Sequence, residues 1–113
     1  MNESKRTSQV LKRFRELYPD GIAWKFNDRI ARSRPDSLFL LQVARFVEFK
    51  MEGNQPTPGQ MLELQKLAKA GHWTAVVWFT GKQFYLRRVL EHGFELPPLD
   101  VFYSVDELCH FLA

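Results

Sequence analysis

Two apolar runs separated by a short break constrain the fold of this chain more than any other feature. The segment from 34 to 50 reads RPDSLFLLQVARFVEFK. Residues Ser37–Val43 and Arg45–Lys50 have the composition of β-strands, and their closeness in sequence predicts an antiparallel pair. Charged residues stand at the head of the first run and inside the second, where burial costs free energy: Asp36, Glu48 and Lys50. The segment therefore predicts the middle of a sheet, and the cost of burying its charged residues must be offset by some other interaction.

The rest of the pattern predicts one α/β domain spanning residues 1–113, which its length also suits. Helical spacing and capping residues predict helices at Glu3–Leu17, Pro58–Ala70 and Ser104–Leu112. Further strands are predicted at Ile22–Asn27, Thr74–Phe79, Gln83–Val89 and Val101–Tyr103, with a loop over Glu91–Asp100. The order α-β-β-β-α-β-β-β-α indicates a sandwich with a mixed central sheet. Strand 74–79 follows a strand and a helix, so we expect it to pair parallel with strand 45–50.

Composition narrows the setting in which the chain works. No apolar run reaches the roughly 18 residues needed to cross a membrane, and the N-terminus lacks the apolar stretch of a signal peptide. Cys109 is the single cysteine, so we expect a core thiol and an intracellular, cytoplasmic protein.

Charge is unevenly distributed along the sequence. Residues 1–34 hold nine Lys and Arg against four acids, whereas the remainder holds seven bases against nine acids. A basic first third suits a polyanionic partner such as nucleic acid, although a solvated helix rich in Lys and Arg explains it equally well.

The charged residues of the hairpin converge on one edge of the predicted sheet. Side chains alternate along a strand, so Glu48 and Lys50 share a face and lie roughly 6.6 Å apart along it. A register symmetric about Val43 places Asp36 opposite Lys50 and makes Glu48 its diagonal neighbour. Two carboxylates and an amine at one edge suit a Mg²⁺ or Mn²⁺ site. The alternative is an ordinary salt bridge on a half-exposed sheet.

The spacing of these motifs resembles that of a known nuclease superfamily. Pro35-Asp36, followed by Glu48-Phe49-Lys50 at the end of an apolar strand, resembles the PD-(D/E)XK pattern. More narrowly, the chain is similar to stand-alone VRR-NUC domains. The similar features are Glu3 in the first helix, RSRPD, VEFK, TPGQ and LELQKLAKAG. The resemblance covers residues 3–80 and the closing segment VFYSVDELCHFL, and 81–100 reads as an insertion.

The resemblance implies a restriction-endonuclease-like sandwich and assigns roles to particular residues. Asp36 and Glu48 would bind Mg²⁺ or Mn²⁺ together with the backbone carbonyl of Phe49. Lys50 would position or activate the attacking water. Glu3 would add a carboxylate, and Gln60 would stand at the edge of the site.

Each of the outer residues also has a plain structural explanation. Glu3 suits a helix N-terminus, and Gln60 with Thr57 forms a capping box. Lys25, Arg32 and Arg34 flank the site, where they would contact phosphates or simply stay solvated.

These expectations combine into a functional hypothesis. The chain is expected to be a metal-dependent deoxyribonuclease that hydrolyses phosphodiester bonds in branched DNA, such as a Holliday junction or a flap. The resemblance further implies a homodimer and a phage or bacterial setting. The alternatives are a catalytically inactive nucleic-acid-binding module of the same fold and a purely structural interaction domain.

Overall fold

The computed structural model describes residues 2–26, 35–97 and 99–113, and these form a mixed α/β fold. Its helices are α1 (Glu3–Leu17), α2 (Pro58–Lys69) and α3 (Val105–Leu112). Its strands are β1 (Ile22–Lys25), β2 (Ser37–Leu40), β3 (Ala44–Met51), β4 (Trp73–Thr80), β5 (Gln83–Leu90), β6 (Gly93–Phe94) and β7 (Asp100–Phe102). The predicted α/β class is confirmed, and the order of elements differs from the expected one only by β6.

The strands form a single mixed sheet in the order β1-β2-β3-β4-β5-β6, with β7 also paired to β5. The parallel neighbours are β3 and β4, which α2 connects as a crossover, and the other pairs are antiparallel. This confirms the predicted parallel pairing of the strand that contains Glu48 with the strand that follows α2.

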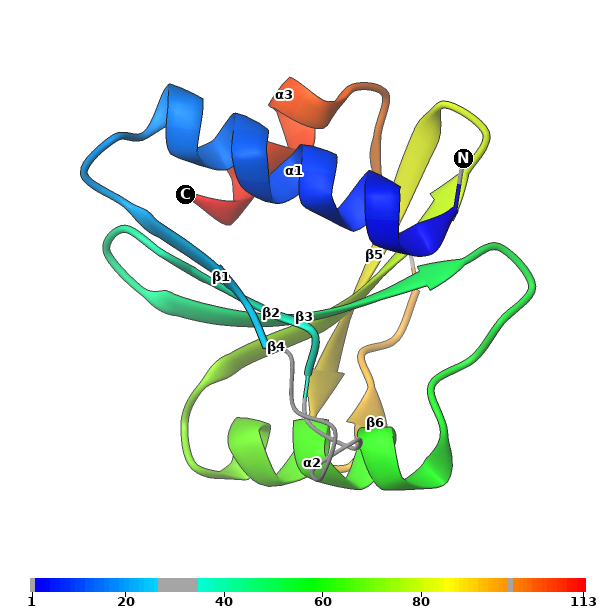
Figure 1. Cartoon of the computed structure of the whole chain (residues 1–113). Coiled ribbons are helices and arrows are strands. Elements are labelled where there is room, and N and C mark those ends of the chain that lie inside the picture. The colour runs from blue at the N-terminus through cyan, green and yellow to red at the C-terminus, as the bar shows by residue number, and fades with distance from the viewer. Residues whose placement is uncertain (1, 27–34, 98) are drawn as a thin grey trace.

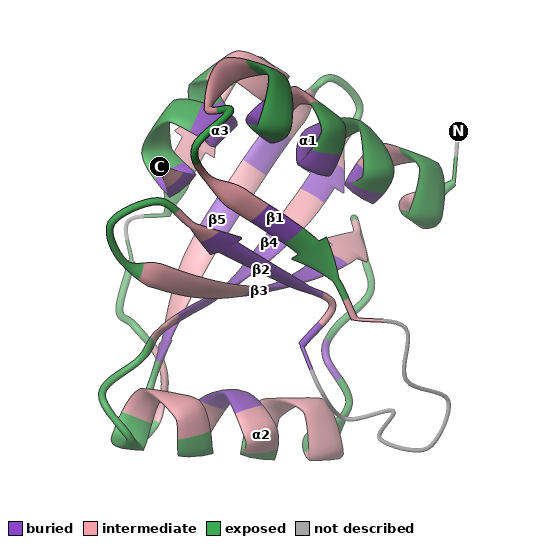
Figure 2. Ribbon diagram, turned by 60° about the vertical axis from the view of Figure 1, so that its left-hand side comes forward, coloured by how far each residue is buried: buried purple, intermediate pink, exposed green. Residues whose placement is uncertain are grey.

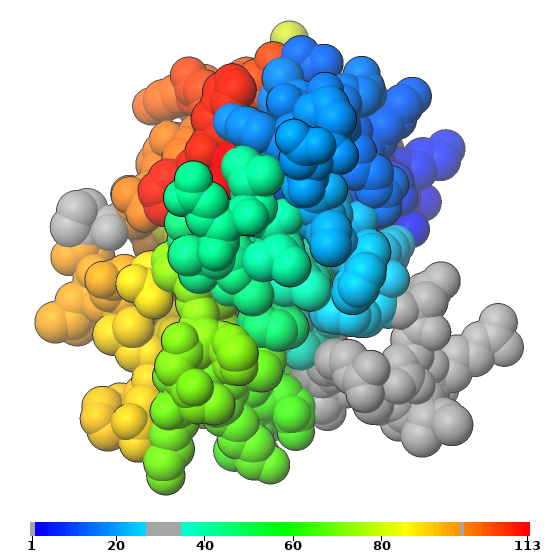
Figure 3. All heavy atoms as spheres, turned by 90° about the vertical axis from the view of Figure 1, so that its left-hand side faces the viewer, coloured from blue at the N-terminus to red at the C-terminus, as the bar shows by residue number. Residues whose placement is uncertain are grey.

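Helices cover both faces of the sheet (Figure 1). Helices α1 and α3 lie together on one face, and α2 lies on the other, over β4 and β5. Figure 2 shows that the buried residues gather in the sheet and on the inner sides of α1 and α3. In the view of Figure 3, the turn between β2 and β3 lies between the layer of α1 and α3 and the layer of α2. No helix among the described residues is long and apolar enough to cross a membrane.

Alternation along β3 decides which of its side chains enter the main core. Val47 and Phe49 are fully buried in the cluster that α1 and α3 cover. Phe46, Glu48 and Lys50 therefore project from the opposite face, where α2 packs. That face has a much smaller apolar cluster, made of Leu64, Val76 and Val89 with three partly buried neighbours.

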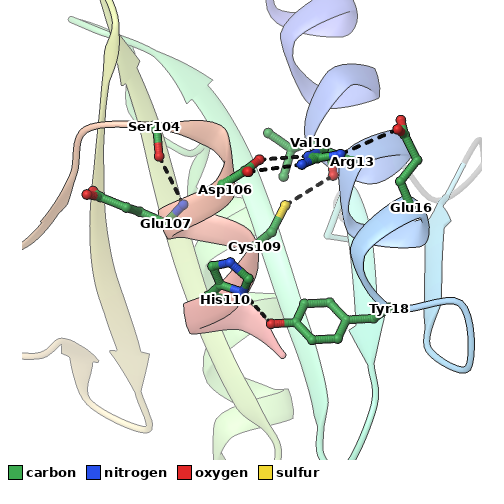
Figure 4. A network of polar contacts seen from close by, with 9 residues as sticks. All are labelled: Val10, Arg13, Glu16, Tyr18, Ser104, Asp106, Glu107, Cys109 and His110. Atoms are coloured by element: carbon green, nitrogen blue, oxygen red, sulfur yellow. Dashed lines mark hydrogen bonds and ion pairs between the residues drawn. The ribbon is translucent and has the colours of Figure 1, made fainter.

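Polar contacts join α1 to α3 above the sheet (Figure 4). Arg13 donates two hydrogen bonds to the carboxylate of Asp106, at 2.7 and 3.0 Å. The Tyr18 hydroxyl is hydrogen-bonded to Nδ1 of His110. Burial raises the pKa of the Cys109 thiol to about 12, and its S–H donates to the Val10 carbonyl. Cys109 is thus the core thiol that the sequence predicted.

The structure corrects the predicted register of the central hairpin. Strand β2 ends at Leu40 and not at Val43, and the last pair before the turn is Leu40 with Ala44. Leu41 and Val43 are apolar, which favoured a longer strand, but they are 36% and 51% exposed in the turn. The turn therefore centres on Gln42. Continued by one residue, the observed register sets Asp36 opposite Glu48, so the predicted opposition to Lys50 is wrong.

Two further details differ from the sequence-based expectations. The predicted loop over 91–100 contains β6, which pairs with the end of β5, and its last residue Asp100 begins β7. Ser104 and Glu107 stand at capping-box spacing, which predicts reciprocal hydrogen bonds at the start of the last helix. Ser104 does cap α3 by accepting from the Glu107 N–H, but the Glu107 carboxylate accepts from the Tyr103 N–H and not from the Ser104 N–H. Asn27, at the end of the predicted first strand, and residues 28–34 after it lie outside the described residues.

The buried face of α1 yields a stability prediction. Phe14 is 0% exposed and packs edge-on against Phe39. Phe14→Ala should lower the free energy of unfolding by about 3–5 kcal/mol, because it removes a large core side chain and leaves a cavity. Urea denaturation measures the change. Lys12→Ala, an exposed change on the same helix, is the control. Equal denaturation midpoints for the two variants would contradict the assignment of this face to the core.

Candidate active site

The candidate site lies where β3 extends beyond the end of β2. The pairing of these strands stops at Ser37 with Val47, whereas β3 continues to Met51. Backbone N–H groups on that free edge need other partners. The Phe49 N–H donates to Oδ2 of Asp36 at 2.9 Å, and the Met51 N–H donates to Oε2 of Glu3 at 3.2 Å. Two carboxylates therefore replace the missing strand.

Asp36 is fixed from two sides. Its backbone carbonyl accepts from the Phe26 N–H at 2.7 Å, just past β1, and its carboxylate accepts from Phe49 as described. The neighbouring Ser37 is fully buried at the start of β2. The observed register brings the Asp36 carboxylate directly beside Glu48, closer than the sequence predicted.

Glu48 is a buried carboxylate that is only half satisfied. It is 1% exposed. Its Oε2 accepts from Nε2 of Gln60 at 3.4 Å and lies 4.0 Å from Nζ of Lys50. Its Oε1 is buried without a hydrogen-bond partner among the described residues. Because an unpartnered buried carboxylate oxygen is costly, Oε1 requires a proton or a cation.

The pKa values of the two neighbouring acids, Asp36 and Glu48, are both raised. Burial raises the pKa of Glu48 to about 9, and the negative charge of Asp36 adds to this. Burial also raises the pKa of Asp36, although the hydrogen bond from the Phe49 N–H acts against the rise. Near neutral pH and without a cation, the pair therefore holds a proton, mainly on Glu48.

Lys50 lies beside the acids but forms no tight ion pair with Glu48. Its side chain is 15% exposed, and its contact with Glu48 is at 4.0 Å. A tight ion pair has a charge-assisted hydrogen bond of about 2.7–2.9 Å, so this contact is a loose one. The ammonium group is therefore free to contact an anion at the same edge of the sheet.

Gln60 makes the predicted capping box and also contacts the buried acid. Its Oε1 accepts from the Thr57 N–H at 2.9 Å, and its backbone N–H donates to Oγ1 of Thr57 at 3.1 Å, which completes the capping box of α2. The other end of the same amide, Nε2, donates to Glu48. The cap therefore aims a hydrogen-bond donor at the buried acid.

The available donor atoms fit a hard divalent cation. Among the described residues, no group of three or more His, Cys, Asp and Glu side chains is arranged to hold a metal. Mg²⁺, however, is commonly held by one or two carboxylates, with water and substrate phosphate completing its ligands. The N–H and C=O of one strand residue point to the same side, so the Phe49 carbonyl points to the free edge near Asp36. Asp36, Oε1 of Glu48 and this carbonyl make a suitable set of oxygens.

The outer predicted residues separate into three groups. Glu3 approaches the site, but its carboxylate is engaged by the Met51 N–H. Lys25 is exposed, with Nζ donating to Oγ of Ser4 at 3.0 Å. Arg32 and Arg34 lie outside the described residues.

Trp78 is a neighbour of the site that the sequence analysis missed. It is the register partner of Lys50 in the parallel pair of β3 and β4, and its Nε1–H donates to the Asn54 carbonyl at 2.8 Å. This bond fixes the loop between β3 and α2. The sequence contained part of the signal, because alternation along the predicted strand 74–79 fixes which residues share a face with Trp78. The register of β3 and β4 was also needed to show that this is the face of Lys50.

Comparison with known proteins adds no family assignment. No protein-family model matches the chain, and no curated protein matches it in sequence.

The buried acid pair predicts how the stability of the metal-free protein depends on pH. The folded chain keeps the Glu48 proton up to a pKa of about 9, whereas the unfolded chain releases it near its ordinary value of 4.5. Folding therefore binds a proton between these values, and stability falls as pH rises through this window. Glu48→Gln is neutral throughout, so its melting temperature should fall less from pH 5 to pH 9.

Thermal melts in EDTA across that pH range measure this difference. Glu63→Gln, a change to a partly exposed acid on α2, is the matched control and should follow the wild-type profile. Parallel profiles for the wild type and Glu48→Gln would show that Glu48 is not a buried, protonated group.

Proposed function

We propose that this chain is a metal-dependent DNA endonuclease with a restriction-endonuclease-like arrangement of its sheet and helices. The observation that carries the proposal is the half-satisfied Glu48, buried beside Asp36 and within reach of Lys50 and Gln60. A buried acid pair with an unpartnered oxygen is costly unless a proton, a cation or a substrate compensates it, and such strain is concentrated at functional sites.

Each group of the site has a definite task in phosphodiester hydrolysis. Asp36 and Glu48, with the Phe49 carbonyl, would hold Mg²⁺ or Mn²⁺. When bound, such an ion polarises a phosphate and lowers the pKa of a water. The Lys50 ammonium orients the attacking water and offsets the negative charge that grows on the phosphate in the transition state. Gln60 fixes Glu48 in place, and the Phe49 N–H fixes Asp36. The products would be a 5′-phosphate and a 3′-hydroxyl.

The competing proposal is a non-catalytic nucleic-acid-binding module, which the basic first third of the chain supports. Incubation of branched and linear DNA with the protein in Mg²⁺ or Mn²⁺, set against EDTA, distinguishes the two. Metal-dependent cleavage supports the nuclease, and binding without cleavage under every condition supports the module. The expected homodimer stays a prediction, which light scattering checks against the 13.3 kDa mass of one chain.

Isosteric changes to the acid pair test the site itself. Asp36→Asn and Glu48→Gln should each lower the cleavage rate at least 100-fold, roughly 3 kcal/mol of transition-state stabilisation, while DNA binding persists. Both variants keep an oxygen that accepts the existing hydrogen bond, so their folds should be retained. The rates come from single-turnover assays on purified protein.

Glu3→Gln is the informative comparison for that experiment. Its amide oxygen still accepts from the Met51 N–H. A variant as active as the wild type would therefore show that Glu3 only completes the strand edge and has no part in catalysis. Cleavage by Asp36→Asn or Glu48→Gln at near wild-type rates would refute the assignment of the acid pair.

Gln60→Glu separates the two roles of the Gln60 amide. A glutamate keeps the oxygen that caps α2 but presents a second carboxylate oxygen to Glu48, where the amide now donates. We expect little change in melting temperature and a fall in cleavage rate at every Mg²⁺ concentration tested.

Thr57→Ala provides the reverse case. It removes the hydroxyl that accepts from the Gln60 backbone and should cost about 1 kcal/mol of stability, but it leaves the contact of Gln60 with Glu48 available. Full activity in Gln60→Glu would return Gln60 to a purely structural role.

A further inference from the structure

A pocket of about 360 Å³ lies next to the candidate site on the same face of the sheet. Its floor is formed by Trp78 and Thr80 of β4 and by Tyr85 and Arg87 of β5. The loop that contains Gln55 forms one wall, and Leu99 lies at the rim.

The pocket adjoins the acid pair through adjacent strands. Trp78 pairs with Lys50 across the parallel ladder and with Tyr85 across the antiparallel one. Neighbouring strands are about 4.8 Å apart, so one strand spacing separates Lys50 from the aromatic floor. A group bound in the pocket and a phosphate at Lys50 therefore belong to the same or adjoining nucleotides.

The walls of the pocket are held in place before anything binds. The Trp78 indole donates to the Asn54 carbonyl, and the Tyr85 hydroxyl donates to Oε1 of Gln83 at 2.8 Å. Arg87 donates to the Glu95 carbonyl and lies over the Phe94 ring. The loop turns at Gly53, whose φ of +87° other residues rarely adopt. Rigid aromatic surfaces of this kind lower the entropic cost of binding a flat ligand.

The chemistry of the lining selects among possible occupants. Aromatic faces with amide and hydroxyl groups around them are the usual means of holding an unstacked nucleobase. Gln55 and Thr80 also line the pocket, and their amide and hydroxyl groups can hydrogen-bond to the edge of a base. The lining carries one acid and one base, Glu52 and Arg87, so it offers a phosphate no net positive charge. We assign the phosphate to Lys50.

We propose that this pocket receives an unpaired base next to the scissile phosphate, so that the substrate is DNA with single-stranded nucleotides at the cleavage point. The inference rests on the proposed nuclease function and narrows its substrate. A base within an intact duplex is stacked on both faces and does not reach such a pocket, whereas flaps, forks and single strands offer bases that do. A fully paired substrate is thereby disfavoured.

Fluorescence of 2-aminopurine tests the proposal without cleavage. The probe is placed at successive positions of a single-stranded oligonucleotide, a forked duplex and a blunt duplex of the same sequence, each titrated with wild-type protein in EDTA. Stacking on the pocket floor should quench the probe at one position near the fork or in the single strand, with no such response in the blunt duplex.

Tyr85→Ala should weaken binding to the fork and the single strand about tenfold and leave binding to the blunt duplex unchanged. Tyr85→Phe keeps the ring and should bind as the wild type does. Tyr103→Ala, a change to a tyrosine that is 65% exposed and does not line the pocket, is the matched control. Gln55→Ala changes an exposed loop side chain in the lining and should reduce affinity even if Tyr85→Ala proves unstable.

Cleavage in Mg²⁺ is measured in a separate assay. The nuclease function and the base-binding pocket can therefore be refuted independently of each other. Metal-dependent cleavage with no quenching and no effect of Tyr85→Ala or Gln55→Ala would overturn the pocket assignment and leave the nuclease intact. Quenching that depends on Tyr85, with no cleavage in any metal, would support the pocket and refute the nuclease. A folded Tyr85→Ala variant that binds the fork and the single strand as tightly as the wild type does would also overturn the base-binding role.

Discussion

The hydrogen-bond requirement of a single strand edge determines how the site is built. Strand β3 continues past the end of β2, and its N–H groups at Phe49 and Met51 need acceptors. Carboxylates from Asp36, just before β2, and from Glu3 of α1 provide them. The same bonds that complete the sheet edge thereby bring Asp36 beside Glu48. The position of the acid pair is a direct consequence of the unequal lengths of two strands.

The features of the fold that depend on local sequence could be predicted, whereas those that depend on tertiary contacts could not. The bounds of α1 and the start of α2 agree with the spacing of apolar residues and the capping residues, because both signals are local. The predicted register of the hairpin was wrong, because the apolar Leu41 is typical of a strand although it belongs to the turn. Strand β6 is two residues long and exists only through its pairing with β5. Within the site, residue types were predictable, but the unpartnered oxygen of Glu48 depended on packing.

Incomplete coverage by α2 leaves space for polar groups on one face of the sheet. The helix packs over β4 and β5, and its one fully buried side chain is Leu64. At the end of β3, the contact from this helix that carries polar chemistry is the hydrogen bond from the Gln60 amide to Glu48. Apolar packing on the other face, around Phe14, Phe39 and Phe49, supplies the stability that this arrangement lacks. The fold therefore separates the face that stabilises it from the face that carries charge.

The shared use of the Gln60 amide narrows what position 60 can tolerate. One end of the side chain must accept a hydrogen bond from the helix cap, while the other must donate one to a buried acid. Glutamate lacks the donor, methionine offers only a weakly accepting sulfur and leucine lacks both groups, while asparagine is one methylene shorter. Two independent demands thus converge on a single residue type. Fewer residue types can therefore satisfy position 60 than a position where only the helix cap must be satisfied.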